Sequence, residues 1–406
     1  MKASQFAAFV GVGAVLLLTG VRSDGAGSAC PLDVDCSGSA DVATDVVYIA
    51  RSLLGLAPVP ASFRTLDPTI PPDSSVAANV AALCPGQNVA SDGVTLINQP
   101  STFPVVIDQP GSYRLKSNLT VPDANTTAIS VTADDVTLDL NGFTISGPTV
   151  CSTTANVTTT GCAPTGTGQG IASPNSNITV INGTVRGMGS AGISLGSEAR
   201  VERVQARRNG GAGITTGGFS TITNCASANN GGLGIIAEND SIIVSNRVIG
   251  NAGDGTGRAG ISTNFFSTLT ANIVAYNGGV GIDAGQGCTL VGNTLGENST
   301  SGIYASMSGD TITGNTSTSN MNGIEVGWGC TVSGNTTSSN RYSGIFSYDG
   351  SLVSSNTVSD NLQVGIDMSQ GSTTGYVNNV VNGGNTQVAG GIEMGANVCR
   401  GTLTCP

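Results

Sequence analysis

Short runs of alternating apolar and polar residues fill most of the chain, and one apolar position within them returns at a fixed period. It is the isoleucine of a Gly-Ile pair, which recurs at Ile171, Ile193, Ile214, Ile235, Ile261, Ile282, Ile303, Ile324, Ile345, Ile366 and Ile392. Eight of the ten steps are 21 or 22 residues long, and the other two, 235–261 and 366–392, are 26. A period held over more than 200 residues indicates stacked structural repeats. Because such a unit is too short for two helices and their turns, each is predicted to form three short strands, one coil of a parallel β-helix.

Asparagines at two further fixed positions support this phase. The first set lies eleven residues after an isoleucine, or twelve for Asn315 and Asn378, and comprises Asn182, Asn246, Asn272, Asn293, Asn315, Asn335, Asn356 and Asn378. The second set lies about five residues further on and comprises Asn251, Asn277, Asn298, Asn320, Asn340 and Asn361. Asparagine tolerates left-handed backbone, which suits tight turns, and stacked amides can hydrogen-bond from coil to coil. We expect a continuous stack from about Ile129 to Ile392 with these isoleucines inside, and the two longer steps as five-residue loops.

The pattern resembles the right-handed parallel β-helix repeat proteins of the pectate-lyase-like superfamily. The resemblance covers residues 105–398, and its first segments are Pro110–Leu115 and Asp135–Gly142. It implies an all-β, right-handed solenoid with about 21 residues per coil. The superfamily includes lyases, hydrolases, epimerases, phage tailspikes and adhesins, so the fold does not choose among these functions.

Composition and charge narrow the choice of partners. The net charge is −11, and lysine occurs only at Lys2 and Lys116, which argues against nucleic acid and anionic membrane surfaces as partners. The N-terminus carries Lys2, an apolar run over 6–21 and small residues over 26–29, the pattern of a signal peptide over 1–29. Cys30 leaves a lipoprotein as the alternative. We expect a secreted or cell-surface protein with no membrane span.

The ten cysteines suit disulfide formation in an exported protein. Cys151 and Cys162 are expected to close a loop inserted early in the solenoid, and Cys399 and Cys405 to tie down a tail over 399–406. Cys84 is expected to pair with either Cys30 or Cys36. The remaining three, Cys225, Cys288 and Cys330, are expected to be small core residues.

An acidic segment near the N-terminus has the spacing of a calcium loop. Oxygen-bearing residues and a turn glycine at position 6 match an EF-hand-type loop, with candidate ligands Asp33, Asp35, Ser37, Ser39, Asp41 and Asp45. The segment resembles a dockerin-like calcium loop, although position 12 is Thr44 and the acid follows at Asp45. We expect a small α-helical Ca²⁺ module over 30–85 and a linker over 86–104. A second loop is missing, so a cohesin-like partner is a weaker expectation, and a solvated acidic turn capping a helix is the alternative.

A strip of acidic and aromatic residues is predicted on one outer face. The residue after each repeat isoleucine should point outward, because side chains alternate along a strand. In the later coils these residues are Asp283, Tyr304, Glu325, Phe346, Asp367 and Glu393. Just beyond them along the chain lie Phe265, Phe266, Trp328 and Tyr348.

Exposed aromatic rings in line suggest a ligand, because they are costly to leave uncovered. The rings can stack on sugars, so the candidate substrate-binding residues are Phe265, Phe266, Tyr304, Trp328, Phe346 and Tyr348. Asp283, Glu325 and Asp367 are candidate catalytic carboxylates of a polysaccharide hydrolase or lyase. The alternative is that the strip binds no ligand. The aromatic residues would then be present because parallel sheets favour them, and the carboxylates because they keep the protein soluble.

Two features limit the chemistry. There is no histidine, which excludes any histidine-based triad. A group of four arginines forms either a local surface patch or an anion site: Arg200, Arg203, Arg207 and Arg208.

The leading hypothesis is a secreted β-helix protein that binds extracellular or cell-surface polysaccharide. A further hypothesis is that it also cleaves this polysaccharide. The alternatives are a non-enzymatic structural or adhesin-type rod and a dockerin-borne subunit of a larger extracellular complex.

Overall fold

The computed structural model describes residues 93–153, 159–251, 259–400 and 405. The chain divides into two compact units, residues 1–95 and 96–406, and the described residues belong almost entirely to the second. The signal peptide and the calcium-loop module predicted within 1–85 lie outside them. Among the described residues there are strands and turns but no helix, and so none that could cross a membrane.

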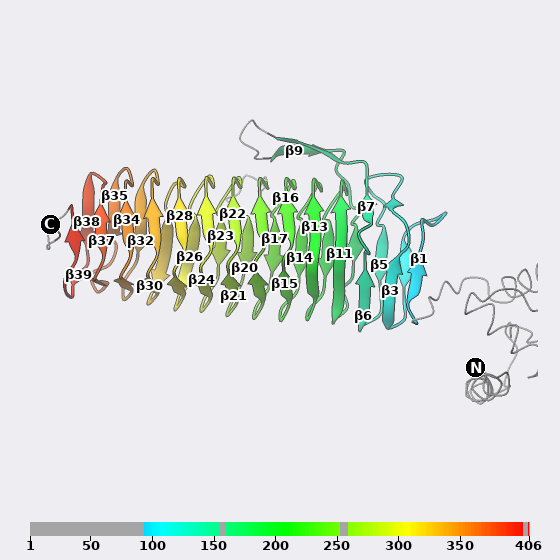
Figure 1. The fold of residues 1–406 in the computed structure, drawn as a ribbon, viewed down its shortest axis with the longest axis horizontal. Coiled ribbons are helices and arrows are strands. Elements are labelled where there is room, and N and C mark those ends of the chain that lie inside the picture. The colour runs from blue at the N-terminus through cyan, green and yellow to red at the C-terminus, as the bar shows by residue number, and fades with distance from the viewer. Residues whose placement is uncertain (1–92, 154–158, 252–258, 401–404, 406) are drawn as a thin grey trace, which may run out of the picture. The chain divides into compact units, whose positions relative to one another are not determined.

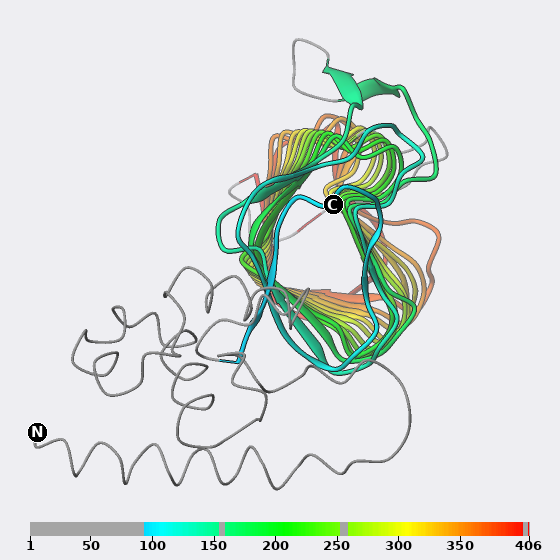
Figure 2. The same ribbon diagram turned by 90° about the vertical axis from the view of Figure 1, so that its right-hand side faces the viewer.

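The second unit is a solenoid in which each coil contributes one strand to each of three faces (Figures 1 and 2). The first face is a 13-stranded parallel sheet that begins each coil. Its strands are, in spatial order, β2 (Val105–Ile107), β5 (Ile129–Val131), β10 (Ile171–Ala172), β12 (Ile193–Leu195), β14 (Ile214–Thr216), β17 (Ile235–Ala237), β20 (Ile261–Thr263), β23 (Ile282–Ala284), β26 (Ile303–Ser308), β29 (Ile324–Trp328), β32 (Ser343–Ser347), β35 (Val364–Met368) and β38 (Thr386–Gly390).

The second and third faces together form a 25-stranded sheet, because two long strands bend from one face to the other. These two are β11 (Ile178–Arg186) and β13 (Arg200–Arg207). The second face otherwise consists of β1 (Thr95–Ile97), β3 (Gly111–Leu115), β6 (Val136–Asp139), β15 (Thr221–Thr223), β18 (Ile242–Val244), β21 (Thr268–Thr270), β24 (Thr289–Val291), β27 (Thr311–Thr313), β30 (Thr331–Ser333), β33 (Leu352–Ser354), β36 (Gly375–Val377) and β39 (Ile392–Glu393).

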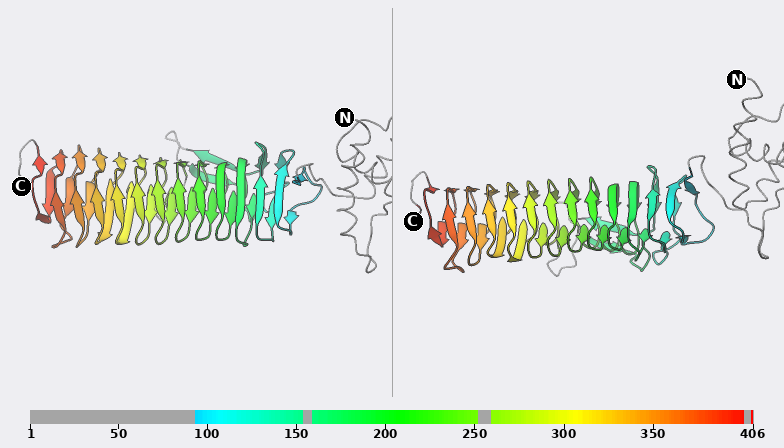
Figure 3. Two further views of the ribbon diagram at one scale, coloured as in Figure 1. Left: turned by 60° about the horizontal axis from the view of Figure 1, so that its bottom comes forward. Right: turned by 90° about the horizontal axis from the view of Figure 1, so that it is seen from below.

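The third face completes each coil. It consists, besides the second halves of β11 and β13, of β4 (Leu119–Thr120), β7 (Thr144–Ser146), β16 (Ala226–Ala228), β19 (Arg247–Ile249), β22 (Ile273–Ala275), β25 (Thr294–Gly296), β28 (Thr316–Thr318), β31 (Thr336–Ser338), β34 (Thr357–Ser359), β37 (Val380–Asn382) and β40 (Val398–Cys399). Figure 3 shows the coils following one another in chain order along the solenoid.

The repeat isoleucines form the core, as predicted, with one exception. From Ile171 to Ile366 they pair in register along the first face and have no exposed surface. Ile392 is the exception, because it lies in β39 on the second face and is 51% exposed. Val388 takes the inward place beside Ile366 instead. The last coil therefore has nearly the usual length, and the loop predicted for 366–392 is wrong. The extra residues of the 235–261 step coincide with 252–258, outside the described residues.

Buried asparagines form two ladders at the turns that flank the third face. The turn from the second to the third face contains Asn246, Asn272, Asn293, Asn315, Asn335, Asn356, Asn379 and Asn397. The turn from the third to the first face contains Asn209, Asn230, Asn251, Asn277, Asn298, Asn320, Asn340 and Asn361. Each side chain bonds the backbone and the side-chain amide of its neighbour, so the predicted coil-to-coil hydrogen bonding is confirmed.

Two of the predicted ladder residues lie one position away from the ladder. Asn182 and Asn378 have left-handed backbone, with φ of 60° and 57°. The same left-handed position is taken by Arg203, Asn224 and Ser245 in intervening coils. An asparagine here serves the turn conformation rather than the ladder, and sequence spacing alone does not separate the two roles.

Both predicted disulfides of the described residues are present. Cys151–Cys162 joins the strands of an antiparallel hairpin, β8 (Val150–Thr153) and β9 (Thr159–Ala163), and Cys399–Cys405 closes the tail. The hairpin stands outside the coils (Figure 1). Cys225, Cys288 and Cys330 are free and buried, as expected.

A third ladder, at the turn from the first to the second face, contains one carboxylate. Ser220, Ser241, Ser267 and Ser351 each accept a hydrogen bond from a backbone N–H of the preceding coil. Asp310 takes this place between Cys288 and Cys330. Its Oδ1 accepts from the Cys288 backbone at 2.7 Å, and its Oδ2 lies 3.7 Å from the Cys330 Sγ. Burial raises the pKa of the Asp310 carboxyl from 3.8 to about 6, and the Cys288 hydrogen bond opposes this shift.

We expect the free energy of unfolding to fall as pH rises through the window from 3.8 to about 6. The folded-state pKa of Asp310 lies above that of the unfolded chain, so the unfolded chain loses this proton first and rising pH favours unfolding. Asp310→Ser restores the serine of the other coils and should remove this component. Thermal melting of both proteins across the window tests it, and an identical pH dependence in the two would contradict the role of Asp310.

Candidate functional site

The predicted acidic and aromatic strip exists on the first face, with its residues in register. Asp283 lies beside Tyr304, Tyr304 beside Glu325, Glu325 beside Phe346, and Phe346 beside Asp367. All five side chains are half-buried and point outward, because their neighbours on either side along each strand are buried. Glu393 is not part of this strip. It lies on the second face beside Tyr376, and Ala389 follows Asp367 instead.

Three aromatic rings form a cluster at the edge of this strip. Trp328 ends β29 and is 55% exposed. Its ring centroid lies 5.4 Å from that of Tyr348, and the Tyr348 centroid lies 5.2 Å from that of Phe346 in an edge-on arrangement. Such pairs favour one another beyond simple burial. The cluster therefore presents an ordered, partly exposed aromatic surface beside Glu325.

Hydrogen bonds orient two of the carboxylates. Glu325 Oε2 accepts from Ser301 Oγ at 2.8 Å and from Asn322 Nδ2 at 3.2 Å. Asp367 Oδ1 accepts from the Ser369 backbone at 3.0 Å and from its Oγ at 2.6 Å. These bonds converge on one oxygen of each carboxylate.

Burial raises the pKa of the Asp283 carboxyl. It lies two coils from Glu325, and Glu325 lies two coils from Asp367. Two coils correspond to about 9.6 Å between Cα atoms at the usual strand spacing. Tyr304 lies between Asp283 and Glu325, so a ring-shaped ligand placed over Tyr304 would have one acidic group on each side.

Phe265 and Phe266 do not join the aromatic cluster. They follow β20, three coils before β29, with ring centroids 6.4 Å apart. Phe266 has left-handed backbone and lies over Gly287. Two coils earlier, the corresponding turn position is Phe219, which is 67% exposed. Sequence analysis missed Phe219, although its spacing of 21 residues from Asp240 places it in the same turn series.

Asp349 is a second residue that sequence analysis missed. It follows Tyr348 directly, and its Oδ1 accepts hydrogen bonds from the Thr373 backbone at 2.9 Å and the Thr373 Oγ1 at 3.1 Å. These bonds lower the pKa of the Asp349 carboxyl. It therefore adds an acidic group next to the aromatic cluster. Asp349 follows Ile345 by four residues, as Trp328 follows Ile324, so the same spacing could have identified it.

Within the described residues, no group of three or more His, Cys, Asp or Glu side chains could hold a metal ion. The strip carboxylates are spread over alternate coils rather than gathered at one point. The predicted calcium ligands from Asp33 to Asp45 lie outside the described residues, and Ca²⁺ binding there stays a prediction.

Solved structures with similar coils include a tailspike and two epimerases. The Dettilon tailspike protein gp208 shares 17% sequence identity at a TM-score of 0.48, covering 79% of this chain; this chain spans 65% of the tailspike's length. The A-module of the Azotobacter vinelandii mannuronan C-5 epimerase AlgE4 shares 16% identity at a TM-score of 0.47, covering 75% of this chain and 90% of the module. The periplasmic alginate epimerase AlgG shares 11% identity at a TM-score of 0.41, covering 74% of this chain and 82% of its own.

No curated protein matches this sequence. The family model described as the right-handed β-helix region matches residues 169–317 and 278–404, which is more than half of the chain. The match covers the coils that carry the ladders and the aromatic strip. This chain belongs to the right-handed β-helix family.

Proposed function

We propose that the first face binds an extracellular or cell-surface polysaccharide at the aromatic cluster. The observation that carries this proposal is the grouping of Trp328, Tyr348 and Phe346 beside the oriented carboxylate of Glu325. Flat rings stack on the apolar faces of sugars, and carboxylates accept hydrogen bonds from sugar hydroxyls. A solenoid whose coils served only as a spacer would have no use for an ordered, half-exposed aromatic surface.

The charge of the strip favours a neutral glycan. Every ionisable side chain of the strip other than Tyr304 is acidic, and the whole chain has a net charge of −11. A polyanionic chain placed on the strip would be repelled by Asp283, Glu325 and Asp367. The substrate class proposed for the first face is therefore an uncharged polysaccharide.

Trp328→Ala is expected to weaken glycan binding at the first face by about 1–3 kcal/mol, taking aromatic stacking on planar ligands as the guide. Trp328 is the only tryptophan of the chain, so quenching of its fluorescence by neutral glycans reports binding directly. Isothermal titration then compares the variants. The matched control is Tyr342→Ala, an exposed aromatic on the turn before β32, which should bind normally. No quenching across a broad panel of neutral glycans would favour the spacer alternative.

Hydrolysis of the bound glycan is a second candidate function, favoured by the raised pKa of the Asp283 carboxyl. A protonated carboxyl can donate its proton to the glycosidic oxygen, while Glu325 accepts a proton from the attacking water. Inverting hydrolases separate these two groups by about 6.5–9.5 Å, and the spacing of two coils, about 9.6 Å, lies at the upper end of that range.

Glu325→Gln is expected to abolish product formation and leave glycan binding nearly unchanged if Glu325 is this base. The amide keeps the shape of the side chain but cannot accept the proton. Product analysis and titration of the same variant separate the two functions. Equal turnover by the wild-type and variant proteins would exclude this role of Glu325.

A further inference from the structure

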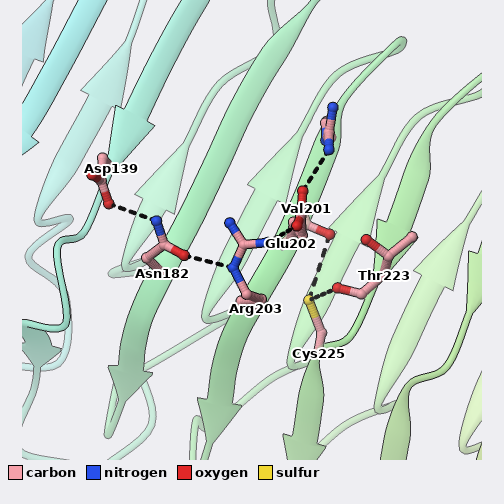
Figure 4. A network of polar contacts seen from close by, with 8 residues as sticks. Asp139, Asn182, Val201, Glu202, Arg203, Thr223 and Cys225 are labelled. Carbon is pink, nitrogen blue, oxygen red and sulfur yellow. Dashed lines mark hydrogen bonds and ion pairs between the residues drawn. The ribbon is translucent and has the colours of Figure 1, made fainter.

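The arginines of the early coils fall into two groups with different surroundings. In the first group, Glu202 pairs with both Arg200 and Arg203. Arg203 Nε also donates to Asn182 Oδ1 at 2.8 Å, and Asn182 Nδ2 donates to Asp139 Oδ1 at 3.1 Å. Figure 4 shows this chain of polar contacts running across three coils. Both arginines of this group therefore have an acidic partner, which they share, in Glu202.

The second group lies on the third face, where no such compensation is found. Arg186 and Arg207 are both exposed and lie directly beside each other in register. Arg208 follows on the turn, and Arg247 lies on β19 two coils after β13. Within the described residues, none of these four takes part in an ion pair. On the third face itself, β7, the second halves of β11 and β13, β16 and β19 contain no acidic residue.

The shape of the surface between these arginines favours a bound group. The coil between Arg207 and Arg247 contributes β16, whose residues are Ala226, Ser227 and Ala228. Ser227 is buried, so this coil presents only the methyl groups of the alanines outward. Long guanidinium side chains thus flank a low surface on both sides. Guanidinium groups bind carboxylates and sulfates through paired N–H donors.

We propose that the third face between β11 and β19 binds a polyanionic glycan that carries carboxylate or sulfate groups. Like charges in register on neighbouring strands are unfavourable, and anionic groups lying over Arg186 and Arg207 would relieve that repulsion. The positive positions extend over four successive coils, from β11 to β19, a span of about 14 Å at the usual strand spacing. A chain with repeated anionic groups matches this span better than one small anion.

The third-face strands from β7 to β19 argue for a glycan over other polyanionic surfaces. They expose no large apolar side chain that could enter a membrane and no aromatic ring that could stack on bases. The arginines of this surface are therefore complementary in charge to a flexible chain with spaced anionic groups. This site is on a different face from the aromatic strip and does not depend on the function proposed there.

The test is binding of fluorescent dextran sulfate and of polygalacturonate to the full chain, with uncharged dextran as the reference. The Arg186→Gln/Arg207→Gln double variant is expected to lose about tenfold in affinity at low salt and to show a shallower salt dependence, because fewer counterions are released on binding. The matched control, Arg200→Gln/Arg341→Gln, changes the net charge equally and should keep near wild-type affinity. Ala228→Glu places an acid in the patch with all arginines intact and should also weaken binding.

Unchanged melting temperatures would show that the exposed substitutions leave the fold intact. Equal losses in both double variants would overturn the proposal, because net charge alone would then explain binding. Failure of both polyanions to bind the wild-type chain at low salt would overturn it too. Arginine-dependent binding to vesicles of anionic phospholipid, without binding to either glycan, would overturn the proposal of a glycan ligand. It would indicate that this face binds a membrane surface instead.

Discussion

Asn293→Ala is expected to lower the free energy of unfolding of the β-helix by about 3–5 kcal/mol, since each buried group left unsatisfied costs about 1–3 kcal/mol. Asn293 lies in the middle of the first ladder with 1% of its surface exposed. Its Nδ2 donates to the Leu269 carbonyl and to Asn315 Oδ1, both at 2.9 Å. Its Oδ1 accepts from the backbone and side chain of Asn272, both at 3.0 Å.

The alanine variant removes all of these bonds. It leaves the Asn272 backbone N–H and one N–H of the Asn272 amide buried without an acceptor, and it takes one donor from the Leu269 carbonyl, while Asn272 Nδ2 keeps its bond to the Ile243 carbonyl. Denaturant unfolding measures the loss, and hydrogen exchange at the Asn272 backbone amide localises it, because coils interact only with their neighbours. Asn264→Ala is the matched control, since Asn264 is exposed and its side chain is no part of a ladder. A loss below about 1 kcal/mol at Asn293 would show that water replaces the missing amide.

The core and the ladders could be predicted from the sequence because the fold repeats one local environment. Every repeat isoleucine from Ile171 to Ile345 pairs with an isoleucine in each of the two adjacent coils, so the sequence period marks the buried position directly. Ile392 follows a glycine like the other repeat isoleucines, but it does not occupy their position in the coil. Its place was taken by Val388, which fills the same space without the preceding glycine. A pattern built on one residue type fails where a similar side chain can substitute at the end of the stack.

The strip was predictable for a related reason, and its limits are physical as well. Alternation along a strand places Tyr304 and Glu325 outward, and register then aligns them. Residues in turns and at strand ends obey no such rule, so Phe266 and Trp328 could be placed near the strip but not assigned to one cluster. The exchange of serine for Asp310 inside a turn ladder, and the separation of Arg207 from Arg203 onto different faces, depend on turn geometry that spacing does not encode.

The glycine of each Gly-Ile pair has a steric explanation. None of these glycines from Gly170 to Gly365 has positive φ, so conformational freedom is not the reason for the residue. At Gly323, an added Cβ would lie 2.3 Å from the Gly344 carbonyl oxygen of the next coil and 2.8 Å from Asn340 Nδ2. The corresponding glycines other than Gly260 meet the carbonyl of the following coil in the same way, for example Gly302 against Gly323 at 2.7 Å. Glycine is therefore required by the close stacking of the coils.

Gly323→Ala is accordingly expected to destabilise the β-helix by about 3 kcal/mol, the upper part of the usual range for overpacking. The obstructing atom belongs to backbone that is held by its own strand pairing, so it cannot move aside as a flexible side chain would. Gly296→Ala is the matched control, because its added Cβ would meet nothing closer than 3.6 Å. Denaturant unfolding should leave the control at or slightly above wild-type stability, since alanine restricts the unfolded chain more than glycine. Equal stability of the two variants would mean that neighbouring coils separate at little cost, and the fixed Gly-Ile period would need another explanation.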